Sequence, residues 1–148
     1  MFIAGGFDSI GNASIKNIAV WDGNVWSNIG NFPGGDTVSS IIHKLIIDPN
    51  GDIYCSVQFD SVFPFENKIV KYDGINWEFL PAIYGNLSFV TDLEFYKNNL
   101  YVSGYFNVGD GNIGNNILYL ENNQWKNLDS GTNGKVRDML NYNDKLWV

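Results

Sequence analysis

The feature that most constrains the fold is a motif that occurs three times along the chain. Two positions stand five residues apart in "NIAVWDGNVWSNIG" (17–30), "NKIVKYDGINWEFL" (67–80) and "NNILYLENNQWKNL" (115–128). The first position is Trp21, Tyr72 or Leu120, and the second is always tryptophan: Trp26, Trp77 or Trp125. Recurrence at a nearly fixed spacing is typical of repeat proteins, in which each unit packs against the next.

Two further apolar elements recur in the same order around this motif. One often ends in Gly and Phe and covers 1–7, 53–59 and 100–106, with a stub at 146–148; the other covers 41–48, 89–96 and 135–142. The repeat starts at Met1, Ile53, Leu100 and Leu146 are spaced by 52, 47 and 46 residues. The chain therefore divides into repeats 1–52, 53–99 and 100–145, and residues 146–148 begin a fourth.

The recurring elements have the composition of short β-strands. They are rich in Ile, Val, Tyr, Trp and Phe, are bounded by Gly, Asn or Asp, and lack helical periodicity. Asp22-Gly23, Asp73-Gly74 and Asn122-Asn123 predict hairpin turns, because Gly and Asn tolerate a positive φ. The sequence thus predicts an all-β fold: a β-propeller of four-stranded antiparallel blades, with about three repeats of 46–52 residues in this chain. The tryptophan of each blade is expected to pack in the seam against the neighbouring blade.

These residues resemble the kelch-type β-propeller repeat, and more closely the kelch-like repeats of secreted and cell-surface proteins. "MFIAGGF" (1–7) carries the glycine pair and "WDGNVW" (21–26) carries the aromatic-Asp-Gly-x-x-Trp step. The pair becomes Val57-Gln58 in the second repeat and keeps one glycine, Gly104, in the third. The resemblance implies that the 41–48 type of element is the innermost strand, the glycine-ended strand the second, and the tryptophan strand the outermost. It also implies a binding scaffold, since enzymes are a minority of the family.

Composition excludes several classes of partner. The net charge of −7 and the single arginine, Arg137, argue against binding a nucleic-acid backbone. No apolar run approaches the length of a membrane span, so membrane insertion is not expected. The acidic, Asn-rich composition and the resemblance to surface propellers favour an extracellular, cell-surface or virion-surface location.

Residues that could hold a metal or cofactor are few. His43 is the only histidine and Cys55 the only cysteine, so a structural histidine and a buried small hydrophobe are expected. A copper-radical site like that of the kelch-like copper enzymes cannot be assembled from them. "DPNGD" (48–52) places oxygen ligands at alternate positions, as calcium loops do, but lacks a distal Glu and is explained as a turn. We expect no metal, no cofactor and no catalytic residue.

The carboxylates do not form a recognisable catalytic pair. Those that recur in register at turns are expected to cap hairpins: Asp8, Asp60, Asp22, Asp73 and Glu121. Those outside the register do not converge on a motif: Asp36, Asp92, Glu94 and Glu66.

Four aromatic residues outside the repeat pattern are the candidate ligand-binding residues. Phe63 and Phe65 flank Pro64 in a linker, while Phe32 and Tyr84 follow tryptophan strands. Loops on a propeller face often carry binding function, and such aromatics stack on sugars or anchor proteins. Ordinary packing across a blade seam is the competing explanation.

The sequence therefore predicts a non-catalytic recognition or structural module that binds a protein or glycan through loops on one face. The alternative is a part of a propeller-fold enzyme, a glycosidase or lyase, whose active site lies in blades not present here. Three repeats are too few to close a ring. We expect further repeats in a longer chain; the alternative is a second copy of the chain, in which 135–142 completes the blade begun by 1–30 of its mate.

Overall fold

The computed structural model describes residues 1–33, 40–59, 66–83, 86–107 and 116–148. These residues form thirteen strands and contain no helix, so none of them belongs to a helix able to cross a membrane. The strands make four antiparallel sheets of two to four strands, none of which closes on itself. The all-β prediction is confirmed.

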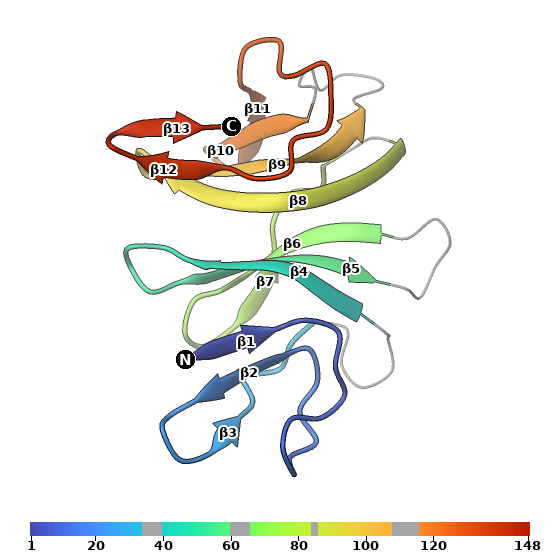
Figure 1. Ribbon diagram of the computed structural model, residues 1–148, viewed down its shortest axis with the longest axis vertical. Helices are drawn as coiled ribbons and strands as arrows, with labels where there is room; N and C mark the ends of the chain where they lie inside the picture. Colours follow the sequence, from blue (N-terminus) through green and yellow to red (C-terminus); the bar gives the residue numbers. More distant parts are fainter. Residues whose placement is uncertain (34–39, 60–65, 84–85, 108–115) are drawn as a thin grey trace.

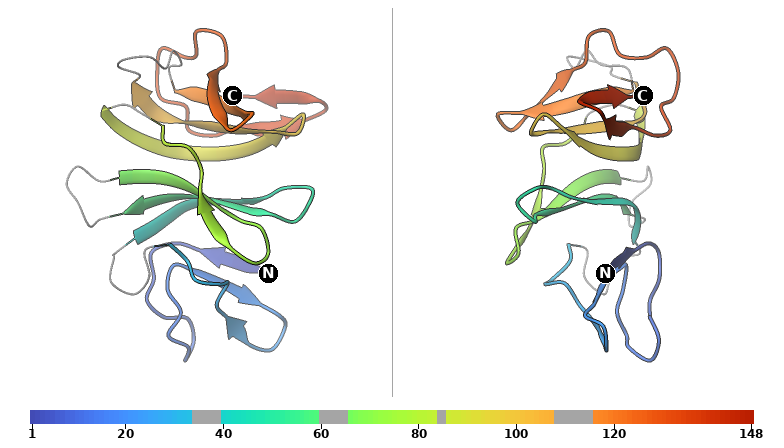
Figure 2. Two further views of the ribbon diagram at one scale, coloured as in Figure 1. Left: turned by 180° about the vertical axis from the view of Figure 1, so that it is seen from behind. Right: turned by 60° about the vertical axis from the view of Figure 1, so that its left-hand side comes forward.

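Each sheet is a meander in which strands pair with their neighbours in the chain. The first sheet contains β1 (Phe2–Ala4), β2 (Ile18–Trp21) and β3 (Trp26–Ser27). The second contains β4 (Ser40–Ile47), β5 (Ile53–Phe59), β6 (Glu66–Tyr72) and β7 (Trp77–Phe79). The third contains β8 (Asn86–Tyr96), β9 (Asn99–Asn107), β10 (Ile117–Glu121) and β11 (Gln124–Asn127), and the fourth contains β12 (Leu140–Tyr142) and β13 (Lys145–Trp147). The first three sheets follow one another along the long axis of the molecule in chain order, and the fourth sheet lies beside the third at the same end (Figures 1 and 2).

Strand register explains the five-residue spacing of the motif. Trp21 lies opposite Trp26, Tyr72 opposite Trp77, and Leu120 opposite Trp125, in each case across a hairpin. Asn122 and Asn123 both have positive φ, 50° and 58°, as a two-residue hairpin turn requires. The two Asp-Gly hairpins have four-residue loops instead, in which the aspartate caps the loop. In all three repeats the recurring five-residue spacing marks a cross-strand pair.

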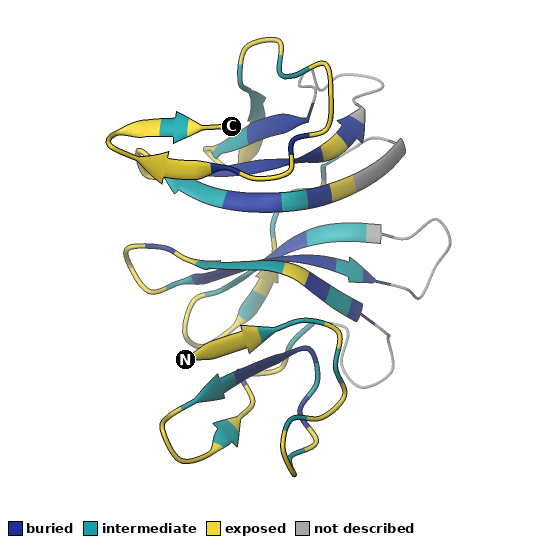
Figure 3. Cartoon of the chain, viewed as in Figure 1, coloured by how far each residue is buried: buried dark blue, intermediate teal, exposed yellow. Residues whose placement is uncertain are grey.

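The core lies between successive sheets. Between the first and second sheets, Ile18 and Ile29 pack against Cys55, Val57 and Val70. The corresponding cluster between the second and third sheets consists of Tyr54, Ile69, Val90, Leu93, Leu100, Val102, Phe106, Leu118 and Trp125. Buried residues gather on the second and third sheets, while exposed residues are frequent on the two end sheets (Figure 3). Burial of each sheet face therefore depends on a neighbouring sheet.

The tryptophan column joins the second sheet to the first and the third sheet to the second. The Trp77 indole N–H donates to the Ile29 carbonyl at 2.8 Å, and the Trp125 indole N–H donates to the Pro81 carbonyl at 2.7 Å. Trp125 is buried, whereas Trp77 and Trp26 are half-buried. Trp26 packs on Trp21, with ring centroids 5.1 Å apart. Seam packing is confirmed for the second and third sheets.

The strands in the end sheets are shorter than the sequence predicts. The strand expected over 1–7 covers only Phe2–Ala4, and the one expected over 135–142 covers only Leu140–Tyr142. Each end sheet lacks strands that the complete sheets possess, so fewer ladder hydrogen bonds hold the chain extended. The segment before β12 is instead attached by Val136 N–H to the Gly104 carbonyl at 3.1 Å.

Candidate functional site

Of the four aromatic candidates, only Phe32 lies among the described residues; Phe63, Phe65 and Tyr84 lie outside them. The Phe32 ring is half-buried and meets Trp77 edge to face, with centroids 5.0 Å apart. It packs beside the core between the first and second sheets. One side of the Phe32 ring therefore packs against the core, as the competing explanation in the sequence analysis proposed.

A hollow of about 430 Å³ opens on the first sheet beside the Phe32 ring. It is formed by the end of the loop before β2 and by the segment after β3. Its lining combines one aromatic ring with aliphatic and polar groups: Ser14, Lys16, Asn17, Ile18, Asn28, Ile29, Gly30, Asn31 and Phe32. Ser14, Asn28 and Asn31 are exposed, so their polar side chains are accessible at the rim.

Asn17 fixes one wall of the hollow. Its φ is 63°, its backbone N–H donates to the Phe7 carbonyl at 2.9 Å, and its carbonyl accepts the Gly5 N–H at 2.9 Å. Its side-chain Nδ2 donates to Ser40 Oγ at 2.8 Å, which ties the first sheet to the second. Asn17 is therefore a structural element of the hollow.

Asn116 holds an equivalent place before β10. Its φ is 65°, and its carbonyl accepts the Gly104 N–H at 3.1 Å. Sequence reasoning missed this pair, although an asparagine that precedes the apolar stretch in both repeats was the available signal.

Gly30 brings the other wall close to the second sheet. Its φ is 56°, and a Cβ at this position would lie 3.1 Å from Tyr72 Cε2 and 3.4 Å from Trp77 Nε1. The left-handed backbone and the close approach together favour glycine. This placement lets Ile29 accept the Trp77 indole bond and sets Phe32 against the Trp77 ring.

Lys16 adds a positive charge to the hollow. Its Nζ lies 4.0 Å from Asp8 Oδ1, and the Asp8 side chain is 91% exposed. Water screens an ion pair of this kind, so it adds little to stability. The hollow therefore presents a cation, amides and a hydroxyl around one aromatic ring.

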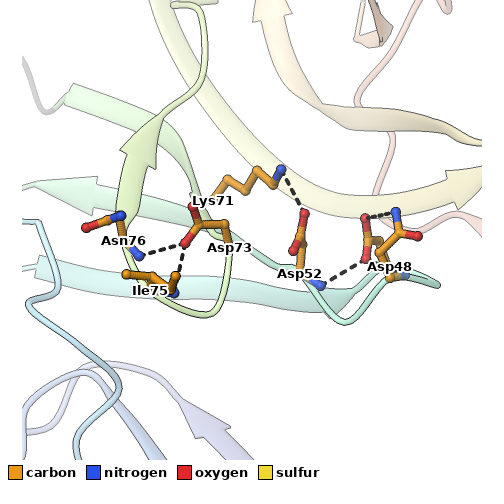
Figure 4. Close-up of polar contacts among 7 residues, drawn as sticks. Asp48, Asp52, Lys71, Asp73, Ile75 and Asn76 are labelled. Atoms are coloured by element: carbon orange, nitrogen blue, oxygen red, sulfur yellow. Dashed lines mark hydrogen bonds and ion pairs between the residues drawn. The ribbon is translucent and has the colours of Figure 1, made fainter.

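The loop at 48–52, considered above as a calcium loop, is held as a turn by its own carboxylates (Figure 4). Asp48 Oδ1 accepts backbone N–H groups of Asn50 at 2.8 Å and Asp52 at 2.9 Å. Asp52 Oδ2 pairs with Lys71 Nζ at 2.8 Å, and this bond raises the pKa of Lys71. The described part of the chain contains no group of three or more His, Cys, Asp or Glu residues suited to a metal ion. The geometry favours the turn interpretation.

The hairpin aspartates cap their loops, as the sequence predicts. Asp73 Oδ1 accepts the N–H groups of Ile75 at 2.8 Å and Asn76 at 2.6 Å (Figure 4). Asp22 makes the same two bonds in the first sheet. These backbone hydrogen bonds lower the pKa of both carboxyls, because they favour the charged form.

An ion pair between Lys44 and the buried Asp92 links the second sheet to the third, and Asp92 also holds the segment before β12. Asp92 is 1% exposed; its Oδ1 lies 2.6 Å from Lys44 Nζ and its Oδ2 accepts the Met139 N–H at 2.6 Å. Burial, followed by the charge of Asp92, raises the pKa of Glu94. The Asp92 carboxylate thus links the second sheet, the third sheet and the segment before β12.

Sequence reasoning named Asp92 and Glu94 but did not place them together with Lys44. The available signal was that Lys44 and Asp92 occupy the same position of successive repeats, in "IIHK" and "FVTD". Two other carboxylates lie outside the register of the repeat. Asp36 is outside the described residues, and the structure does not describe the Glu66 side chain.

The single histidine and the single cysteine have the structural roles predicted for them. His43 is exposed on β4, with Nε2 at 3.2 Å from Gln58 Oε1. Cys55 is fully buried, and burial raises the pKa of its thiol to about 12. Neither residue lies among the lining of the hollow.

Comparisons of the chain with family models, with curated proteins and with solved structures found no match.

Proposed function

We propose that this chain is part of a β-propeller and acts as a non-catalytic recognition module, which binds a glycan in the hollow beside Phe32. The propeller is supported by sheets that repeat the same meander, the same cross-strand pair and the same indole bond to the preceding sheet. In such a ring, β4 and β8 are the innermost strands and the tryptophan strands the outermost. Further repeats of a longer chain, or a second copy, complete the ring.

The hollow beside Phe32 is the observation that carries the binding proposal. A sugar offers an apolar ring face and a rim of hydroxyl groups, so its sites combine an aromatic ring with amides and hydroxyls. Phe32 supplies the ring, while Asn28, Asn31 and Ser14 supply exposed polar groups around it. The geometry therefore favours a neutral or acidic sugar, with Lys16 as the contact for an acidic one.

Two other functions are compatible with the same fold. A protein ligand would use Phe32 as an anchor and would extend over neighbouring loops. The enzyme alternative places a glycosidase or lyase site in other blades, since Asp92 is engaged by Lys44 and Met139. Location at an extracellular, cell or virion surface fits glycan binding and belongs to the same proposal.

A glycan array followed by calorimetry tests the binding site. Asn28→Ala and Asn31→Ala are expected to weaken binding of the selected glycan at least about 10-fold, because each removes hydrogen bonds to the sugar. Asn24→Ala is the matched control: it removes an exposed asparagine of the same sheet that does not line the hollow.

Three results would contradict this proposal in different ways. Absence of any glycan ligand refutes the glycan assignment, and equal loss in the Asn24→Ala control refutes the location of the site. A protein captured through Asn28 and Asn31 would select the protein-binding alternative instead.

A further inference from the structure

The first sheet exposes a face that is buried in the second and third sheets. We call the face of a sheet that points toward the preceding sheet its leading face. In the second and third sheets the repeat-equivalent leading residues are covered: Ile53 is 3% exposed, Cys55 0%, Leu100 3% and Val102 0%. In the first sheet their counterparts are open, since Met1 is 70% exposed and Ile3 39%. The leading face is therefore covered in the second and third sheets and exposed in the first sheet.

The tryptophan column shows the same difference. Trp77 and Trp125 each donate an indole N–H to a backbone carbonyl of the preceding sheet, at Ile29 and Pro81. These acceptors lie three residues after Trp26 and four residues after Trp77. Trp26 has no such acceptor within the described part of the chain.

The open edge of β1 identifies the type of strand that it lacks. The equivalent strands β5 and β9 each pair on both sides, β5 with β4 and β6, and β9 with β8 and β10. Among the strands of the described residues, β1 pairs only with β2. The missing neighbour is therefore a strand of the β4 and β8 type, and an unpaired edge of this kind is a template for another chain.

β12 is a strand of this type, and β13 occupies the place that β1 would take beside it. β12 follows the third sheet as β8 follows the second, and it pairs with the three-residue β13. Its register, Leu140 with Trp147 and Asn141 with Leu146, matches the pairing of Ile46 with Tyr54 and Ile47 with Ile53 between β4 and β5. Since Leu146 corresponds to Met1, β1 can replace β13 in the same register.

We propose that two copies of this chain associate by exchange, in which β1 of one copy displaces β13 of the other and pairs with its β12. Asn141 then lies opposite Met1 of the second copy, and Leu140 opposite its Phe2. Each junction becomes a four-stranded sheet of β12, β1, β2 and β3, stacked on the third sheet of the copy that supplies β12.

The exchange satisfies the groups that the single chain leaves open. The leading face of the first sheet takes the place of Leu146 of β13, which in the single chain packs in one cluster with Tyr101, Ile117 and Leu128. By the spacing seen at Trp77 and Trp125, the Trp26 indole of one copy donates to the carbonyl of Leu128 or Asp129 of the other. The twofold arrangement repeats this junction and leaves neither β1 edge unpaired, and closed twofold dimers are the commonest soluble oligomers.

Light scattering and sedimentation of the whole 148-residue chain between about 1 and 100 µM test this proposal, because most specific protein complexes populate their bound state within or below that concentration range. We expect a dimer of twice the 16.6 kDa chain mass that tightens with added salt, since each copy carries a charge of −7. Ile3→Lys and Leu140→Lys are expected to weaken dimerisation at least about 10-fold. Ile75→Lys is the control, as Ile75 is 78% exposed in a hairpin loop away from the junction.

Two further measurements keep the proposal falsifiable if a charged variant unfolds. Removal of residues 145–148 takes away the competing strand and is expected to strengthen dimerisation several-fold. A Phe2→Cys/Leu140→Cys variant is expected to form an intermolecular disulfide, visible as a doubled mass on a non-reducing gel. Within one chain these two residues lie in the first and fourth sheets, at opposite ends of the stack (Figure 1).

A folded monomer at every concentration, open-ended polymers, or unchanged association without β13 would each overturn the exchange. So would equal effects of Ile75→Lys and Ile3→Lys. The hollow beside Phe32 is a separate feature of the molecule. The glycan-binding experiments and the dimerisation experiments can therefore give opposite results.

Discussion

Replacing Trp125 with alanine tests whether the tryptophan column holds adjacent sheets together. Trp125 is 8% exposed, packs in the cluster between the second and third sheets, and donates its indole N–H to Pro81. Truncation of a buried tryptophan costs about 3–5 kcal/mol through lost burial and the cavity left behind. We therefore expect the free energy of unfolding to fall by about 3–5 kcal/mol.

Urea denaturation followed by circular dichroism measures this loss. With a denaturant slope of about 2 kcal/mol per molar urea, the midpoint is expected to fall by about 1.5–2.5 M. Both proteins must be compared at one concentration, because self-association shifts the midpoint. Trp125→Phe keeps most of the apolar contact and removes the N–H, so it should cost about 1–2 kcal/mol.

Trp147→Ala is the matched control. Trp147 is 56% exposed, and its indole N–H bonds only within its own hairpin, to the Tyr142 carbonyl at 3.3 Å. This substitution should change the free energy of unfolding by less than about 1 kcal/mol. If Trp125→Ala and Trp147→Ala lower the midpoint equally, the tryptophan column does not join the sheets.

Four further outcomes are expected. Lys44→Met should lower the free energy of unfolding by about 1–3 kcal/mol, because it leaves the buried Asp92 carboxylate without its cation, and the 34% exposure of Lys44 limits the loss. The double variant Lys44→Met/Asp92→Asn should recover part of that loss in urea denaturation; no recovery would contradict the buried-charge explanation. The lowered pKa of Asp73 contributes stability that is fully present above its ordinary value of 3.8 and is lost as pH falls through the lowered value. Asp73→Asn should therefore flatten the dependence of the urea midpoint on pH below about 4, and an unchanged slope would refute the cap. With its pKa raised to about 12, Cys55 should react with a thiol reagent at neutral pH only after unfolding; rapid labelling of the folded protein would show that it is accessible. EDTA should leave the thermal midpoint unchanged, whereas a fall of several degrees would indicate calcium at 48–52.

Local patterns predicted most of the secondary structure. Short segments rich in Ile, Val, Tyr, Trp and Phe between Asn, Asp and Gly steps located the strands, because strand and turn preferences depend on near neighbours in the chain. The five-residue spacing of Tyr72 and Trp77 predicted a hairpin, and the two residues do lie opposite each other across one. The order of strands within the complete sheets is the one that the resemblance to kelch-type repeats implied, and in it consecutive strands of the chain are paired.

The candidate site was only partly accessible to sequence reasoning. Phe32 was named from its place outside the repeat, but the hollow beside it depends on Gly30 lying close to Tyr72 and Trp77. Lys44 and Asp92 were both visible in the sequence, yet their contact depends on how one sheet stacks on the next. No local pattern reports a distance between residues 48 positions apart.

By itself, the sequence determined a chain of similar meanders with a tryptophan opposite an aromatic residue or a leucine across each outer hairpin. Only the tertiary structure decided which copy of a repeated position is buried. Ile3, Cys55 and Val102 occupy one position of the repeat, and their exposed fractions are 39%, 0% and 0%. The residue type is set by the repeat, whereas burial requires an adjacent sheet, and in this chain the first sheet has such a neighbour on one side only.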